Sequence, residues 1–327
     1  MPECRITRDK TYIEVFFTLI NMNYLNLLTK LYYHLLKKPG VPYRVLAILQ
    51  GWVRSMANRI LPVYLDKAYS HKIKQSVDVI VSFTSFPTRI NNVWQVVECM
   101  LRQTYQPAKI ILWLSKNQFP SEDSIPLSLQ KRVGNIFEIR FVEGDIRSHK
   151  KYYYVAKEYP NSLVFLIDDD IYYPTDILER SYKERQLHPK TVICNYGYTI
   201  SYDANGIPKP YNQWIKCHKT LESESLFYGS GGGTLFKPSE LYNDLTKIEL
   251  ARNLCPIADD IWLNAMTKLA NNKIIILKYG IILPIHNDND VYLCSMNLGR
   301  SKNDEQIENV EMYYKEVGLK VFEKSTK

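Results

Sequence analysis

The residues best suited to chemistry are three consecutive aspartates, Asp168, Asp169 and Asp170, which directly follow the apolar run 163–167. An apolar run of this length predicts a buried β-strand that ends abruptly in carboxylates. Because adjacent carboxylates repel one another, we expect a compensating cation, and hard oxygen ligands suit Mg²⁺ or Mn²⁺. A metal held there could also bind a diphosphate. The alternative is an acidic turn exposed to solvent, where the charges cost little.

A second acidic pair, Asp259 and Asp260, opens a predicted helix over 259–269. The helix dipole favours negative charge at this end, so simple capping explains one of the two. The functional interpretation makes one of them a general base that removes the proton from an attacking hydroxyl group. We predict that this pair supplies the catalytic base.

A glycine-rich stretch, GSGGG at 229–233, lies between the two acidic sites. It lacks the Gly-Lys-Ser/Thr of a P-loop, and Thr234 stands where the dinucleotide motif requires its last glycine. Glycines allow a backbone to approach a ligand closely or to hinge, although a loop without function would have the same composition. We predict that Gly231, Gly232 and Gly233 form a loop on the acceptor side of the site.

Three polar residues follow the first predicted strand. Ser82, Thr84 and Arg89 could reach a base, a ribose or a phosphate, whereas Pro87-Thr88 between them is also typical of an ordinary turn.

Two lysines and one histidine complete the predicted site. Lys150 and Lys151 precede a helix that leads to the aspartate strand, and either could neutralise a diphosphate, although paired lysines usually form a solvated face. We assign donor binding to Lys150. His286 follows an apolar run and could be a further metal ligand, although a lone histidine is more often structural.

These residues need elements that bring them to one edge of the fold. Short apolar runs predict strands beginning near Asp78, Lys109, Glu138 and Ser162, and amphipathic stretches predict helices over 93–102, 152–158 and 175–186, the last with Thr175 as N-cap. Strands separated by helices predict an α/β fold with a mainly parallel sheet covered on both faces. Ligands bind beyond the carboxyl ends of such strands. A further helix is expected over 304–319.

Length and composition indicate one large α/β domain with an appendage, because 327 residues with 46% hydrophobic side chains can bury one substantial core. The six cysteines form no CxxC pair, which excludes zinc knuckles and thioredoxin-type motifs. No N-terminal stretch has the pattern of a signal peptide. We therefore expect a cytoplasmic protein.

The net charge of +8 lies entirely in the N-terminal segment, since residues 1–77 hold 12 Lys and Arg against 4 Asp and Glu. The sequence thus predicts a basic, aromatic-rich helical appendage (1–77) beside a catalytic domain (78–327), and it does not indicate nucleic-acid binding. The appendage either contacts an anionic membrane surface, at the inner face of the cytoplasmic membrane, or packs on the domain as a helical cap.

The stretch from Tyr12 to Leu36 is long enough to span a bilayer, but it contains charged and polar residues, including Glu14, Lys30 and His34. Such residues are unfavourable in the middle of a membrane, so we do not expect a membrane-spanning helix.

Taken in order, these parts resemble the GT-A glycosyltransferases, particularly bacterial enzymes similar to family 2. The resemblance covers about residues 78–290 and is carried by VSFTSFPTR (81–89), QTYQPAKIILW (103–113), LIDDD (166–170), GSGGGTLF (229–236) and ADDIW (258–262).

The resemblance implies a GT-A type, Rossmann-like sheet and assigns roles to the acidic residues. Asp168 and Asp170 would hold Mg²⁺ or Mn²⁺ with the donor diphosphate, and Asp169 would face the ribose or the sugar. Asp260 would be the base, supported by Asp259. Thr84 and Arg89 would contact the nucleotide.

The implied activity is transfer of a sugar from a nucleotide-sugar donor, with a UDP-sugar favoured, to a glycan or lipid-linked acceptor in surface polysaccharide synthesis, with inversion. Two departures from the family are Leu114-Ser115, where an acidic residue is common, and the lack of a QxxRW motif after Asp260. They leave the nucleotide open and disfavour a processive synthase.

Two other classes remain. A haloacid-dehalogenase-type phosphatase also places D-x-D at a strand end, but it normally has Thr or Val where this chain has Tyr172. A membrane-peripheral scaffold with a degenerate transferase domain would not need the intact carboxylates at 168, 170 and 260.

Overall fold

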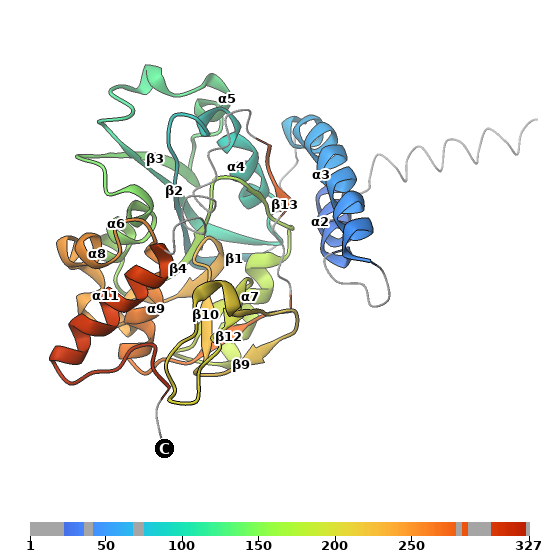
Figure 1. Ribbon diagram of the computed structural model, residues 1–327. Helices are drawn as coiled ribbons and strands as arrows, with labels where there is room; N and C mark the ends of the chain where they lie inside the picture. Colours follow the sequence, from blue (N-terminus) through green and yellow to red (C-terminus); the bar gives the residue numbers. More distant parts are fainter. Residues whose placement is uncertain (1–22, 36–41, 68–74, 279–282, 287–301, 325–327) are drawn as a thin grey trace, which may run out of the picture.

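A central sheet of eight strands organises the chain, of which the computed structural model describes residues 23–35, 42–67, 75–278, 283–286 and 302–324 (Figure 1). The strand order is β3-β2-β1-β4-β11-β6-β12-β9. A three-stranded sheet, β10-β7-β8, and a two-stranded sheet, β13-β5, accompany it.

The strands are β1 (Gln75–Thr84), β2 (Tyr105–Ser115), β3 (Phe137–Val142), β4 (Leu163–Ile167), β5 (Ile171–Tyr172), β6 (Val192–Cys194), β7 (Gly197–Thr199), β8 (Ile215–Lys216), β9 (Leu221–Glu222), β10 (Leu226–Tyr228), β11 (Gly232–Phe236), β12 (Ile274–Ile276) and β13 (Leu283–Pro284).

The helices are α2 (Tyr24–His34), α3 (Tyr43–Asp66), α4 (Val93–Leu101), α5 (Leu127–Gln130), α6 (Lys150–Glu158), α7 (Ile177–Leu187), α8 (Ile248–Leu254), α9 (Asp259–Leu269) and α11 (Lys302–Glu316). Short 3₁₀ turns are η1 (Ile90–Asn92), η2 (Glu122–Ser124), η3 (Arg147–His149), η4 (Tyr211–Gln213), η5 (Pro238–Glu240) and η6 (Asn243–Thr246).

The strand connections create a switch point between β1 and β4. The chain runs outward from β1 to β2 and β3, all parallel, and then returns to add β4 parallel to β1 on its other side. Beyond β4, β11 is antiparallel to both β4 and β6, and β12 is parallel to β6. In open α/β sheets, the crevice outside the carboxyl ends of the strands at such a switch point is the usual ligand site.

Both faces of the sheet are buried. Val79, Val81 and Phe83 of β1 pack with α4 and α7 on one face, whereas Ile80 packs with α6 and α9 on the other. Alternating residues of one strand therefore lie in two different hydrophobic cores. A strand that is buried on both faces must be apolar along its length, as the runs in the sequence are. Figure 1 shows α6, α8, α9 and α11 on one side of the sheet and α4, α2 and α3 on the other.

The predicted α/β fold with a mainly parallel, helix-flanked sheet is confirmed. The predicted strands correspond to β1 to β4, and α9 has the predicted bounds. The prediction for Thr175 was wrong, because Asp176 is the N-cap residue of α7. Thr175 instead accepts a hydrogen bond from Asn26 Nδ2 at 2.8 Å, and its backbone N–H donates to Asn26 Oδ1. It fastens α2 to the domain.

Helices α2 and α3 pack on the domain through one face. Leu25 and Leu28 of α2 and Ala57, Leu61 and Leu65 of α3 are buried in the same core as α4. Within the described part of the chain, no helix is long and apolar enough to cross a membrane. The stretch 12–22 and residue 36 lie outside the described residues, and the division at residue 77 stays a prediction.

Candidate functional site

The three aspartates lie at the switch point. Asp168 follows β4 directly, and its neighbour β1 ends just before Ser85. Because β1 and β4 are parallel, their carboxyl ends meet at one edge, where polar side chains that follow the two strands face one another. The sequence pattern of apolar run followed by acids thus produces a carboxylate cluster at the sheet edge.

Arg89 is the counter-ion of two of the aspartates. Its Nη1 lies 2.9 Å from Asp169 Oδ1 and 2.8 Å from Asp170 Oδ2. Ser85 Oγ donates a hydrogen bond of 2.5 Å to the other oxygen of Asp169. Arg89 and Asp169 are 8% and 6% exposed, so this ion pair is buried. Burial lowers the pKa of Arg89, but Asp169 and Asp170 raise it more, and the guanidinium stays charged.

Lys151 joins the two acidic motifs. Its Nζ lies 2.9 Å from Asp168 Oδ1 and 3.0 Å from Asp259 Oδ2. The side chain is only 7% exposed. Burial lowers the pKa of Lys151, but the attraction of Asp168 and Asp259 outweighs this effect and raises it. One charged ammonium group therefore bridges the strand-end aspartates and the first turn of α9.

The acidic pair is held by the glycine-rich loop. Ser230 Oγ donates to Asp259 Oδ2 at 2.7 Å, and the backbone N–H of Ser230 donates to Asp260 Oδ1 at 2.8 Å. The N-cap residue of α9 is Ala258, so neither aspartate caps the helix.

The pKa of Asp260 is raised to about 6, first by burial and then by repulsion from Asp259, while attraction to Lys151 and a hydrogen bond with Ser230 oppose the shift. A general base works best with a pKa near the operating pH, so this carboxylate is suited to accepting a proton near neutrality.

Gly231 lies directly against Asp168. A Cβ atom at this position would be 1.8 Å from Asp168 Cγ, so only glycine leaves room for the carboxylate. The backbone N–H of Asp168 donates to Gly231 O at 3.1 Å and to Tyr173 Oη at 2.8 Å. Gly233 has a φ of +92°, which a residue with a side chain rarely adopts. The prediction of a loop holds for Gly231, which contacts Asp168. It was wrong for Gly232 and Gly233, because these are the first two residues of β11.

The other polar residues predicted near the donor have other partners. Lys150 is buried and pairs with Asp145, whereas its neighbour Lys151 reaches the acids. Thr84 Oγ1 donates to the backbone oxygen of Trp113 at 2.8 Å. Ser82 Oγ donates to the backbone oxygen of Lys151 at 2.5 Å, which fixes the start of α6 against β1.

His286 reaches the neighbourhood of Asp170 through its backbone. Ile285 N donates to Asp170 O at 2.7 Å, and His286 N donates to Asn58 Oδ1 at 2.7 Å. The His286 side chain is exposed. Among the described residues, no three His, Cys, Asp or Glu side chains group to hold a metal, so His286 does not complete a set with Asp168 and Asp170.

The aspartates still fit a divalent cation that is shared with a phosphate ligand. Mg²⁺ commonly uses one or two carboxylates and takes its remaining ligands from phosphates and water. The side chains of Asp168 and Asp170 are 39% and 23% exposed, so both reach solvent. The compensating charge expected from the sequence is supplied in part by Arg89 and Lys151, which pair with the three acids, and the metal stays a prediction.

Reasoning from the sequence missed Ser85 and Ser230. Both are single serines in short polar turns, and nothing in their spacing distinguishes them from ordinary turn residues. Their hydrogen bonds become apparent only once the strand ends and the loop have been brought together.

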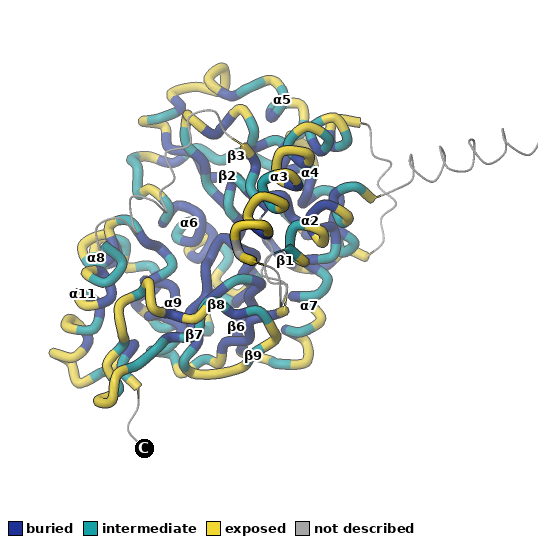
Figure 2. The backbone as a smooth tube through the Cα atoms, turned by 45° about the vertical axis from the view of Figure 1, so that its right-hand side comes forward, coloured by how far each residue is buried: buried dark blue, intermediate teal, exposed yellow. Residues whose placement is uncertain are grey.

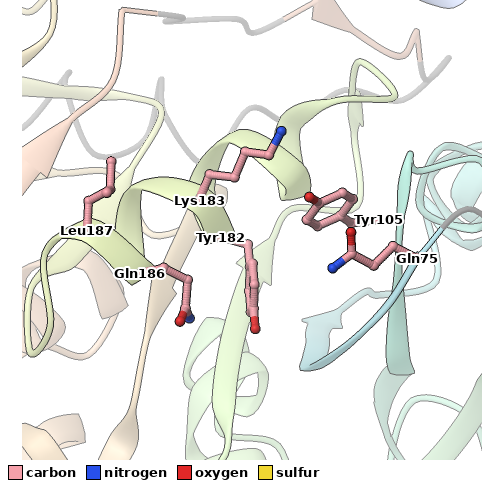
Figure 3. Close-up of a pocket in the computed structure, with 6 residues that line it drawn as sticks. All are labelled: Gln75, Tyr105, Tyr182, Lys183, Gln186 and Leu187. Atoms are coloured by element: carbon pink, nitrogen blue, oxygen red, sulfur yellow. The ribbon is translucent and has the colours of Figure 1, made fainter.

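A hollow of about 450 Å³ lies at the opposite edge of the sheet, lined by Gln75, Tyr105, Tyr182, Lys183, Gln186 and Leu187 (Figure 3). Gln75 and Tyr105 are the first residues of β1 and β2, whereas the aspartates follow the last residue of β4. The hollow therefore takes no part in the carboxylate site.

Comparisons with known proteins find only distant similarity. No family model matches the sequence, and no curated protein matches it. A 4-diphosphocytidyl-2C-methyl-D-erythritol synthase superposes with a TM-score of 0.41 and 13% identity, covering 69% of this chain and 99% of its own. For an apo UDP-glucose pyrophosphorylase the TM-score is 0.37 and the identity 11%, covering 74% and 99%. At such TM-scores these similarities carry no argument about the activity of this chain.

Proposed function

We propose that this chain is a metal-dependent glycosyltransferase that moves a sugar from a nucleotide-sugar donor, with a UDP-sugar favoured, to a hydroxyl group of a glycan or lipid-linked acceptor. One observation carries the proposal: Lys151 bonds both Asp168 and Asp259. Two acidic motifs that are distant in the sequence thereby share one site at the switch point of the sheet. Such a site can bind a diphosphate and activate a hydroxyl group at the same time.

The donor would bind beyond the carboxyl ends of β1 and β4, where ligands bind in sheets of this kind. Asp168 and Asp170 would hold Mg²⁺ or Mn²⁺, which when bound supplies positive charge to the departing diphosphate. Lys151 and Arg89 keep the carboxylates in place before any ligand arrives. Preorganised charge of this kind stabilises a transition state without reorganisation during the reaction.

Asp260 would act as the base. It takes the proton from the acceptor hydroxyl as that oxygen bonds to the anomeric carbon of the sugar. The bond between the anomeric carbon and the diphosphate oxygen breaks, and the nucleoside diphosphate leaves with the bonding electrons. Attack on the face opposite the leaving group inverts the anomeric configuration. Gly231, Gly232 and Gly233 would border the acceptor, because the connection from β10 into β11 joins Asp168 to the acidic pair.

The test compares donor binding and transfer in two variants of the full chain. Calorimetry with a panel of nucleotide sugars, with Mn²⁺ or with a chelator, is combined with an assay of sugar transfer. We expect Asp170→Asn to lose metal-dependent donor binding. Asp260→Asn should keep donor binding and lose roughly 10² to 10⁴-fold in transfer, the usual contribution of a general base.

The matched control is Asp78→Asn, which removes an exposed carboxylate from the opposite part of β1. It should bind and transfer like the wild type. Equal donor affinity in Asp170→Asn would contradict the metal assignment. Hydrolysis of simple phosphomonoesters would indicate a phosphatase, and no turnover of any donor would indicate a scaffold.

A further inference from the structure

Helix α3 carries an apolar stripe on its outer side. The stripe, called here the α3 outer face, consists of Val45, Ile48, Leu49, Trp52, Met56 and Val63. Their spacings of three, four and seven residues place them on one side of a helix. Trp52 is 75% exposed, Val63 63% and Ile48 61%. Figure 2 shows exposed residues along α3 at the surface of the molecule.

The fold itself uses only the other side of α3. Leu46, Val53, Ala57, Leu61 and Leu65 are buried toward the domain. A helix that is apolar on both sides normally has partners on both sides. Large exposed apolar patches mark sites of interaction with another molecule or with a membrane.

The charges on α3 are almost all positive. Its exposed basic residues are Arg44, Arg54 and Arg59, with Lys67 at the end of the helix, and its only acid is Asp66. Asp66 is already paired with Arg132 at 3.1 Å. Arg59 lies within the stripe itself, between Met56 and Val63.

The apolar stripe together with its positive charge distinguishes between two possible partners, a second copy of this chain and a membrane surface. In a symmetric dimer the same patch would face itself, so arginines would approach arginines, which is unfavourable. An anionic lipid surface complements the charge, and tryptophan favours the interface between membrane and water. We propose that the α3 outer face binds the surface of an anionic bilayer, with its apolar residues inserted among the lipid headgroups. This proposal does not depend on the proposed activity.

The test is flotation of the full-length protein with vesicles of phosphatidylcholine, alone or mixed with phosphatidylglycerol. We expect binding to the anionic vesicles only, weakened by added salt. The variant Ile48→Ser/Trp52→Ser/Val63→Ser should lower the partition coefficient at least about tenfold, because three inserted apolar side chains are removed. The variant Arg59→Gln should lower it about fivefold, because one positive charge within the stripe is removed.

The matched control is Leu127→Ser/Leu187→Ser/Val317→Ser. These residues are 69%, 73% and 66% exposed on other elements, so the control removes equally exposed apolar side chains elsewhere. It should bind like the wild type. The single variant Trp52→Ser, expected to bind more weakly, covers the case in which the triple variant does not fold.

Three results would overturn the proposal. One is a lack of vesicle binding by the wild type. Another is unchanged binding by both α3 variants, which would assign membrane contact to another segment. The third is a dimer in light scattering that the triple α3 variant converts to a monomer, because a second copy would then cover this face.

Discussion

At the residue scale, two buried cations hold the site together. Arg89 pairs with Asp169 and Asp170, and Lys151 pairs with Asp168 and Asp259. Charges removed from water are tolerated only when they are paired, and removing one partner leaves the other uncompensated. Removing either cation should therefore lower the free energy of unfolding, and single substitutions can measure this change.

Replacing Lys151 tests this compensation. Lys151→Met should lower the free energy of unfolding by about 3–5 kcal/mol, because Asp168 and Asp259 lose their common counter-ion. Urea unfolding followed by circular dichroism measures the change. The double variant Lys151→Met/Asp259→Asn should recover part of the loss, since one unpaired charge is removed. If the two substitutions are additive, the ion pair does not have the proposed role.

The pKa of Asp260 predicts the pH dependence of activity. With a pKa of about 6, the carboxylate is protonated in acid and ionised above. The kcat/KM for transfer should therefore rise with pH through about 6 and then level off. Asp260→Asn should abolish this rise in the remaining activity. A wild-type profile that is flat between about pH 5 and 8 would exclude Asp260 as the base.

The same shift predicts how stability depends on pH. The folded-state pKa of about 6 is above the ordinary value of 3.8, so between pH 3.8 and about 6 the native state binds more protons than the unfolded state. The contribution of Asp260 to stability is present below the unfolded pKa and is lost as pH rises through about 6. Asp260→Asn should be more stable than the wild type at neutral pH by about 1–3 kcal/mol and lose this advantage in acid. Urea unfolding at several pH values measures the difference.

At the scale of elements, the loop between β10 and β11 joins the two halves of the site. Its Ser230 holds the acidic pair, and its Gly231 lies against Asp168. A loop without function would show the same glycines in the sequence, but it would not show both contacts. The loop acts as a spacer that sets the distance between the strand-end aspartates and α9.

Gly231→Ala tests this spacer. The added Cβ would displace the Asp168 carboxylate from Lys151, so metal-dependent donor affinity should fall roughly tenfold, about 1.4 kcal/mol. Calorimetry with the donor measures the change. Gly134→Ala is the control, because a Cβ at Gly134 meets nothing within 4 Å. Equal donor affinity of wild type and Gly231→Ala would show that donor binding does not depend on the position of the Asp168 carboxylate.

At the scale of the whole molecule, α3 is linked to the backbone beside the site. Asn58 Nδ2 donates to Pro284 O at 3.0 Å, and Asn58 Oδ1 accepts from His286 N at 2.7 Å and Tyr172 Oη at 3.3 Å. Pro284 pairs with Ile171, the residue after Asp170. A bilayer bound at the α3 outer face would therefore lie at a fixed position relative to the aspartates.

Asn58→Ala tests this link. Four side-chain hydrogen bonds are lost, the three above and one to the Arg54 backbone oxygen. At about 0.5–1.5 kcal/mol for each bond, the free energy of unfolding should fall by about 2–6 kcal/mol. Chemical denaturation measures the change, with the exposed Asn212→Ala as control. Vesicle binding should stay unchanged, because Asn58 is not part of the α3 outer face. Unchanged stability would mean that these bonds do not fasten α3.

The sequence by itself determined the local elements and the positions of the two acidic motifs at the ends of these elements. Runs such as 163–167 are apolar throughout because a strand buried on both faces must be, and α9 begins at its acidic pair because the helix dipole favours that position. Both signals depend on neighbours along the chain, so no tertiary structure was needed to read them.

Only the tertiary structure decided which cations meet which carboxylates. Lys150 and Lys151 are neighbours in the sequence, but successive side chains on a helix point about 100° apart, so only one faces the aspartates. Ser85, Ser230 and Asn26 acquire their roles from partners far away in the chain. Distances between such segments follow from the packing of the sheet, which local spacing does not encode.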